Sequence, residues 1–125
     1  MTDLEWLEQQ FDRCWPFLVR AVRKMKEPYG REYVWERIAS GTAQFWPGMN
    51  CAVVTSIEVR TDGSKIIEGW LAAGDRAEIE EITERAEAFG KRMGCFKARL
   101  IQRPGFKAKP LSGYRLAAVV MEKEL

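Results

Sequence analysis

A possible binding chemistry lies in the stretch 70-WLAAGDRAEIEEI-82, where an apolar run meets a glycine, an aspartate and then a helical pattern. A strand that enters a helix through a glycine is a common phosphate site, because the N–H groups at a helix N-terminus attract anions. Gly74 and Arg76 fit such a site. Asp75 opposes it, since an N-cap aspartate accepts hydrogen bonds from those same N–H groups.

Acidic residues dominate the helical pattern that follows this junction. Between positions 75 and 87 the acids are Asp75, Glu78, Glu80, Glu81, Glu84 and Glu87, and the bases are Arg76 and Arg85. A carboxylate near a helix N-terminus is favourable by about 0.3–1 kcal/mol, and it repels a pyrophosphate at the same place. The pattern therefore favours a well-capped structural helix over a cofactor loop.

Composition excludes several classes of site. The 125 residues contain no histidine, which removes Ser-His-Asp and Cys-His nucleophile systems and the His-containing zinc sites. The three cysteines are scattered and cannot complete a zinc tetrahedron, so no metal site is predicted. An odd cysteine count without a close pair is typical of a reduced cytosolic protein. Because neither a signal peptide nor a run of roughly 20 apolar residues is present, we expect a cytoplasmic chain without a membrane partner.

Helices are expected to come first in the chain. Thr2 and Glu5 predict a capping box, and apolar residues at helical spacing follow it. Pro16 predicts a break, because proline fits poorly inside a helix, and a second helix is expected to begin there. The pattern predicts a shorter helix over 31–40 that ends at Gly41.

Strands are expected in the rest of the chain. A short strand is predicted over 42–46, and the runs 51–60 and 65–73 predict an antiparallel hairpin around a turn with a glycine. After the acidic helix, 95–101 is predicted as a strand parallel to the one before that helix, which gives a right-handed βαβ crossover. The apolar run within 113–125 predicts the last strand.

This order of elements resembles the GNAT superfamily of N-acyltransferases. The run 84-ERAEAFGKRMGCFKARLI-101 resembles the third helix and fifth strand of that fold, and 112-SGYRLAAVVMEKEL-125 resembles its closing strand. The resemblance implies a single α+β GNAT-like domain over 1–125. Its N-terminal helices would be followed by a mixed, mainly antiparallel sheet with one right-handed βαβ crossover.

A closer resemblance is to short phage- and prophage-encoded GNAT-like proteins of unassigned activity. The shared marks are 41-GTAQFWPG-48, 53-VVTSI-57, 70-WLAAGD-75, Gly94-Cys95, 102-QRPGF-106 and 113-GYR-115. The resemblance implies a protein of phage type, located in the cytoplasm or in a virion. Its partner would be an unknown protein, such as a component of the virion or of the host.

The resemblance also implies where an acyltransferase would carry its site. Acetyl-CoA or another acyl-CoA would lie against Leu71, Ala73, Gly74 and Arg76, and Glu68 would be the general base on the strand. Strand alternation places Glu68 on the same face as Trp70 and Ala72.

Two departures from the family pattern argue against that activity. The family's pyrophosphate loop, Gln/Arg-x-x-Gly-x-Gly/Ala, is shortened here to 73-AGDRA-77, and the helix with the tyrosine acid is replaced by the loop 102–112. Tyr114 falls where the fold has a structural aromatic residue, so it is not assigned as the acid.

Positive charge gathers in the C-terminal third. Positions 88 to 121 contain no acid and these eight bases: Lys91, Arg92, Lys97, Arg99, Arg103, Lys107, Lys109 and Arg115. Such a field could attract nucleic acid, CoA phosphates or an acidic protein surface, including that of a second copy. The net charge of only +2 and the absence of a nucleic-acid-binding motif disfavour nucleic acid. Arg103, Phe106 and Lys107 are the predicted interaction loop.

The sequence therefore favours a degenerate GNAT-like protein that works by binding, with no cofactor expected. One alternative is an acyl-CoA-dependent N-acyltransferase with a divergent pyrophosphate loop. Another is nucleic-acid binding through the basic C-terminal third. Whether the chain is an enzyme, and whether it forms a homo-oligomer, stays open at this point.

Overall fold

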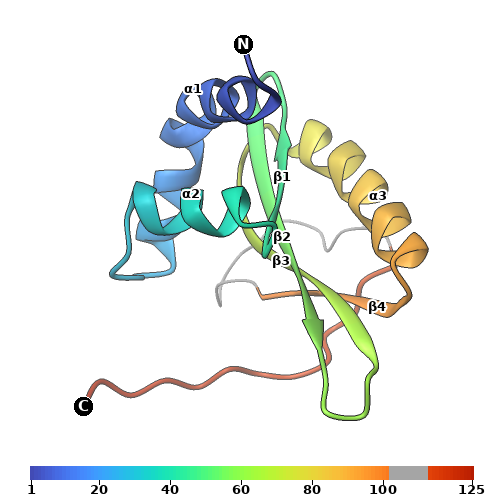
Figure 1. The fold of residues 1–125 in the computed structure, drawn as a ribbon. Helices are drawn as coiled ribbons and strands as arrows, with labels where there is room; N and C mark the ends of the chain where they lie inside the picture. The colour runs from blue at the N-terminus through green and yellow to red at the C-terminus, as the bar shows by residue number, and fades with distance from the viewer. Residues whose placement is uncertain (102–112) are drawn as a thin grey trace.

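A computed structural model describes residues 1–101 and 113–125 of the chain. Its elements are α1 (Asp3–Lys24), α2 (Arg31–Ala39), β1 (Gln44–Pro47), β2 (Cys51–Val59), β3 (Lys65–Gly74), α3 (Arg76–Arg92) and β4 (Cys95–Leu100) (Figure 1). The four strands form one sheet in the order β1-β2-β3-β4, antiparallel except for the parallel pair β3 and β4. The predicted α+β fold with a mixed, mainly antiparallel sheet and one βαβ crossover is confirmed. Among the described helices, none has the length and apolar character needed to cross a membrane.

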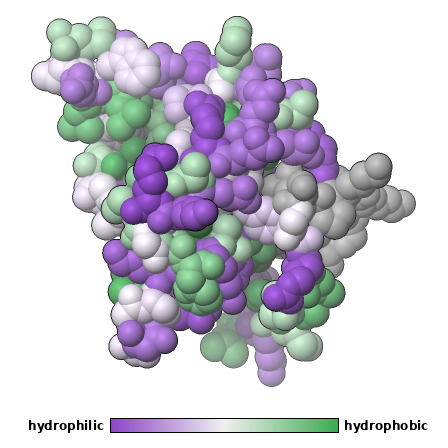
Figure 2. All heavy atoms as spheres, turned by 90° about the vertical axis from the view of Figure 1, so that its right-hand side faces the viewer, coloured by the Kyte–Doolittle hydropathy of each residue, from purple (hydrophilic) through white to green (hydrophobic). Residues whose placement is uncertain are grey.

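Helices cover both faces of the sheet. On one face, α1 and α2 pack against Ala52, Val54, Leu71 and Ala73 of the two central strands, around the buried ring of Phe11. On the other face, α3 packs on alternate residues of β2, and its opposite side is largely hydrophilic (Figure 2). Because successive side chains of a strand point to opposite faces, the strands contribute apolar residues to two separate layers, one on each face of the sheet.

Helix α1 runs without interruption through Pro16, so the predicted break is wrong. The ring of Pro16 is exposed, while Phe11, Cys14 and Leu18 form one continuous buried stripe on either side of it. Because packing of an apolar face supplies most of a helix's stability in a protein, the stripe offsets the backbone hydrogen bond that proline cannot donate. The predicted capping box of Thr2 and Glu5 is confirmed.

The strand predicted within 113–125 does not form in the described chain. Residues 115–125 run away from the body of the molecule (Figure 1), and Leu116, Val119 and Met121 are 84%, 74% and 90% exposed. The prediction is wrong for a single chain because this apolar run finds no neighbouring strand there. As a result, β4 is an edge strand of the described sheet.

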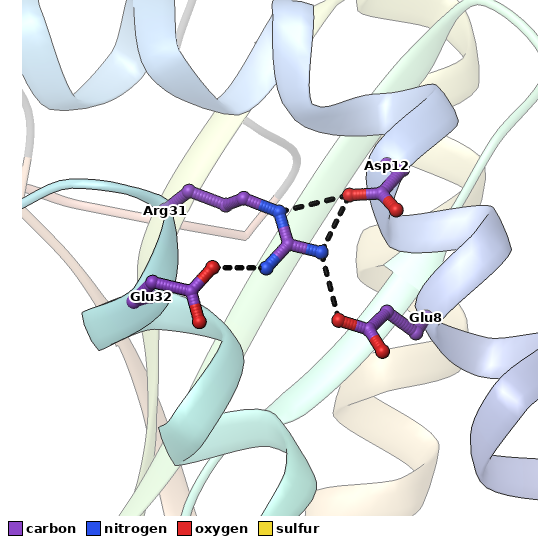
Figure 3. Close-up of polar contacts among 4 residues, drawn as sticks. All are labelled: Glu8, Asp12, Arg31 and Glu32. Carbon is purple, nitrogen blue, oxygen red and sulfur yellow. Dashed lines mark hydrogen bonds and ion pairs between the residues drawn. The ribbon is translucent and has the colours of Figure 1, made fainter.

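Arg31 joins the first two helices through a cluster of carboxylates (Figure 3). At the start of α2, its guanidinium donates to Oδ1 of Asp12 at 2.8 and 2.6 Å, to Oε2 of Glu8 at 2.9 Å, and to Glu32. It also lies 5.3 Å from the centre of the Phe11 ring. The bonds to Glu8 and then Asp12 raise the pKa of Arg31 further above its ordinary value. Arg31 therefore clamps α2 against α1 at the edge of the core.

Replacing Arg31 with alanine should destabilise the fold by about 1–2 kcal/mol, since exposed ion pairs contribute about 0.2–1 kcal/mol each and the contact with Phe11 adds a similar amount. Arg31→Lys should recover only part of this, because an ammonium lacks the planar fork. Urea unfolding in low and high salt measures both effects. Arg20→Ala, an exposed arginine on α1, is the control, and an equal loss in that variant would contradict the clamp.

Candidate functional site

The junction between β3 and α3 is a single residue long. Strand β3 ends at Gly74, α3 begins at Arg76, and Asp75 is the N-cap whose carboxylate accepts from the Glu78 N–H at 3.0 Å. The Asp75 N–H donates to the Asn50 carbonyl at 2.8 Å. No loop remains here that could wrap its N–H groups around a pyrophosphate. The predicted capping at Asp75 is confirmed.

Gly74 allows the backbone at the end of β3 to approach the backbone of Asn50 and Cys51 closely. Its φ is +119°, and a Cβ at this position would lie 2.4 Å from the Asn50 carbonyl oxygen and 2.5 Å from Cα of Cys51. No side chain fits between these atoms, and φ in this region disfavours every residue except glycine. The glycine that suggested a phosphate site from sequence is therefore explained by the packing of β3 against the start of β2.

The Glu78 carboxylate reaches from the first turn of α3 into the turn between β1 and β2. It accepts from the Asn50 N–H at 2.9 Å, and a Cβ on Gly48 would lie 2.0 Å from its Oε1 atom. A hydrogen bond from the Cys51 thiol, and then the Asn50 N–H, lower the pKa of Glu78. Burial, and then Glu78 itself, raise the pKa of Cys51 to about 12. The Glu78 carboxylate thus bonds to a residue 28 positions earlier in the chain and not to the N–H of the N-cap Asp75, which donates to the Asn50 carbonyl.

An apolar cleft of about 210 Å³ opens where β3 and β4 separate. Their pairing stops at Gly69 and Leu100, whereas β3 continues to Gly74. The cleft lies between that free part of β3 and α3, whose Ile79, Thr83 and Ala86 line it. A space of this size and lining can hold a short apolar group.

The structure separates the four residues predicted to hold acyl-CoA. Leu71 and Arg76 line the cleft. Ala73 is buried in the layer beneath α1 and α2, to which Leu71 also belongs, and Gly74 packs against β2. Tyr114, which the sequence analysis did not assign as the catalytic acid, also lines the cleft. Burial, and then its hydrogen bond with Glu87 of α3, raise the pKa of Tyr114.

Glu68 lies in a second, more polar hollow of about 220 Å³, whose lining includes Tyr29, Arg37 and Ser56. Oε1 of Glu68 is 3.5 Å from Nε of Arg99, an ion pair without hydrogen-bond geometry that leaves this buried nitrogen without a hydrogen-bond partner. Arg99 donates to Glu58 at 2.7 Å. Glu68 is therefore held as the carboxylate partner of an arginine, and no basic role is evident from its contacts.

A β-bulge at Trp70 interrupts the alternation of side chains that was predicted along β3. Val54 pairs with Leu71 but Thr55 pairs with Gly69, so Trp70 is an extra residue without a partner on β2. Trp70 lines the hollow of Glu68, but Ala72 is exposed on the side of the first cleft. The prediction that Glu68, Trp70 and Ala72 share one face is wrong for Ala72. The two hollows adjoin at Gly69 and Trp70, which line both.

An aromatic cluster beside Glu68 was missed by sequence reasoning. The indole Nε1 of Trp70 donates to the Tyr29 hydroxyl at 2.8 Å, Tyr33 stacks on Tyr29, and the Arg37 guanidinium lies 4.8 Å from the centre of the Trp70 ring. Tyr29 stands in a Pro-Tyr-Gly sequence, which by itself indicates only the end of a helix. Nothing local to that turn indicates a contact with a strand 41 residues away.

The predicted interaction loop of Arg103, Phe106 and Lys107 lies outside the described residues. Within 1–101 and 113–125, no group of three or more histidine, cysteine or acidic side chains could hold a metal ion. The described functional candidates are therefore the apolar cleft and the adjoining hollow of Glu68.

Glu78 should make the stability of the protein pH-dependent in the acid range. Its folded pKa is lowered, so its stabilising contribution is present above the unfolded pKa of about 4.3 and is lost as the pH falls through the folded value. Glu78→Gln should therefore be less stable than the wild type at pH 7, and the difference should shrink toward pH 3. Urea unfolding across this range tests it against Glu81→Gln, an exposed control on α3. A difference that is constant with pH would refute the linkage.

Comparison with known proteins adds one finding. No family model and no curated protein matches the sequence. A crystal structure of a probable acetyltransferase matches the fold with a TM-score of 0.63 and 6% sequence identity, over 93% of this chain and 95% of that chain. At this identity the likeness concerns the fold alone. The chain therefore has an α+β fold similar to that of this probable acetyltransferase.

Proposed function

We propose that this chain is a binding protein of phage or prophage type built on an acetyltransferase-like fold, and that it does not transfer acyl groups. The observation that carries the proposal is that two carboxylates of the chain itself lie at the junction where α3 begins and accept backbone hydrogen bonds there. The Asp75 carboxylate accepts a hydrogen bond from the Glu78 N–H, and the Glu78 carboxylate accepts one from the Asn50 N–H. The N–H groups of Asp75, Glu78 and Asn50 at this junction therefore already have acceptors within the chain.

Electrostatics strengthen the argument. A pyrophosphate at this end of α3 would lie close to both Asp75 and Glu78. At about 5 Å and an effective dielectric constant of about 20, each pair of unit like charges costs about 3 kcal/mol. Arg76 is the basic residue of the junction, and it also forms an ion pair with Glu80 at 3.5 Å. The local charge therefore opposes the diphosphate of a CoA cofactor.

The apolar cleft is the proposed contact site. Most of its lining is small and aliphatic, as at Ala72, Ile79 and Leu100, and polar or charged side chains such as Thr83 and Arg99 lie around it. The exposed Ala72 and the partly buried Trp70 mark its mouth beside the hollow of Glu68. An apolar side chain of a protein partner, a virion or host component in this proposal, would fill such a cleft.

An acyl-CoA-dependent N-acyltransferase is the second candidate function. The observation in its favour is that the apolar cleft, which could hold an acyl group, adjoins the hollow that contains Glu68. In this candidate, Leu71 and Arg76 would contact the cofactor. The Glu68 carboxylate would need to leave Arg99 before it could accept a proton from an amine.

Titration of acetyl-CoA into the protein should give no saturable heat up to millimolar cofactor, because the α3 N-terminus repels the diphosphate. Isothermal calorimetry makes the measurement, and mass spectrometry checks for acyl transfer to added amines. Micromolar binding that is weakened by Arg76→Ala but not by Arg85→Ala, farther along α3, would overturn the proposal and favour the acyltransferase.

The electrostatic reason has its own test. If carboxylates block the site, the double variant Asp75→Asn/Glu78→Gln should bind inorganic pyrophosphate at least tenfold more tightly than the wild type, since two repulsive charges are removed. The matched control is Glu81→Gln/Glu84→Gln, which removes the same charge at two exposed positions farther along α3 and leaves the ion pair of Arg76 with Glu80 in place. Equal binding by both double variants would show that charge at the N-cap is not the obstacle.

A further inference from the structure

Strand β4 leaves one of its edges without a partner in the described sheet. It pairs with β3 alone, and the strand order places it at the end of the sheet. The N–H and C=O groups along such an edge are a ready template for another strand, and proteins usually cover or blunt it. Here β4 spans six residues, Cys95–Leu100, with the apolar Phe96 exposed upon it.

A strand-forming segment lies exposed in the same chain. The residues Leu116–Met121 read LAAVVM, a run of apolar residues with two β-branched valines. Their large side chains are exposed, and the segment is extended without forming a described strand. Figure 1 shows this end of the chain leaving the body of the molecule. In the described part of a single chain, the free edge of β4 and the segment 116–121 therefore both lack a strand to pair with.

We propose that residues 116–121 of one copy pair with the free edge of β4 in a second copy, and that the exchange is reciprocal. The two segments have equal lengths of six residues, so each can satisfy the other along its full extent. Pairing within one chain is disfavoured by Tyr114, which lies in the cleft beneath α3 while the residues after it lead away from the body. The occupant of the β4 edge is therefore a second copy of this chain.

Charge selects the antiparallel direction for the added strand. In that direction Met121 lies near Cys95, and the next residues, Glu122 and Glu124, continue toward Lys91 and Arg92 in the last turn of α3. The two glutamates, with Lys123 between them, then give a net negative segment that meets two bases beyond the end of the strand pair. The parallel direction would carry the same glutamates past the other end of β4, away from these two bases.

Reciprocal exchange makes the interface symmetric, so each dimer contains two identical strand pairs. Backbone hydrogen bonds would supply the contact, and burial of the exposed side chains would add the apolar term. Because only six residues pair on each side, the dimer should dissociate on dilution. This inference concerns assembly alone and does not depend on whether the cleft binds a partner or a cofactor.

Light scattering coupled to size-exclusion chromatography tests the assembly. The wild type should approach twice the mass of one chain at high micromolar concentration and fall toward one mass on dilution. Val119→Asp should remain monomeric at every concentration, whereas Val59→Asp, at another exposed valine, should still dimerise. A wild type that is monomeric throughout, or a Val119→Asp variant that dimerises like it, would overturn the inference.

A disulfide test identifies the pairing itself. Cys95 on β4 is partly exposed, whereas Cys14 and Cys51 are buried. Under mild oxidation, Met121→Cys should link to Cys95 of the second copy and give a dimer on a non-reducing gel. Leu116→Cys, at the far end of the strand, should not, and removing Cys95 with Cys95→Ser should abolish the link. A link within one chain would overturn the exchange, and a link from Leu116→Cys alone would overturn the antiparallel direction.

Discussion

The close approach of Gly74 to the start of β2 is the contact on which the rest of the site depends. No side chain fits between Gly74 and the backbone of Asn50 and Cys51, so the end of β3 rests directly on the β1–β2 turn. The backbone of Asp75 and the carboxylate of Glu78 then bond to Asn50. Helix α3 therefore starts at one defined place and lies across one face of the sheet.

The same contacts have a chemical consequence. A helix N-terminus that is anchored by carboxylates cannot also present a positive field to a phosphate. In this chain the Glu78 N–H donates to the Asp75 carboxylate, and the Asn50 N–H donates to the Glu78 carboxylate. The cleft between α3 and the free end of β3 has a largely apolar lining, so the fold has a cavity beside a helix N-terminus that is capped by a carboxylate.

Much of the fold could be predicted because it follows from local sequence patterns. The buried stripe of α3, the hairpin with its glycine turn, and the caps at Thr2 and Asp75 each depend on residues within a few positions of one another. The predictions fail where distant partners decide the outcome. Pro16 stays helical because the stripe of α1 packs on the sheet, and the run after Tyr114 lacks a partner strand within its own chain.

Apart from the unbroken helix at Pro16 and the missing last strand, the sequence by itself determined the element types, their order and the acidic character of the α3 N-terminus, because periodicity, capping and charge are short-range properties. Tertiary structure alone decided which face each site residue occupies. The bulge at Trp70 arises from pairing with β2, the ion pair of Glu68 needs Arg99 on another strand, and Arg31 meets Asp12 across two helices. Such contacts join residues far apart in the chain, and their geometry exists only after the sheet and helices have packed.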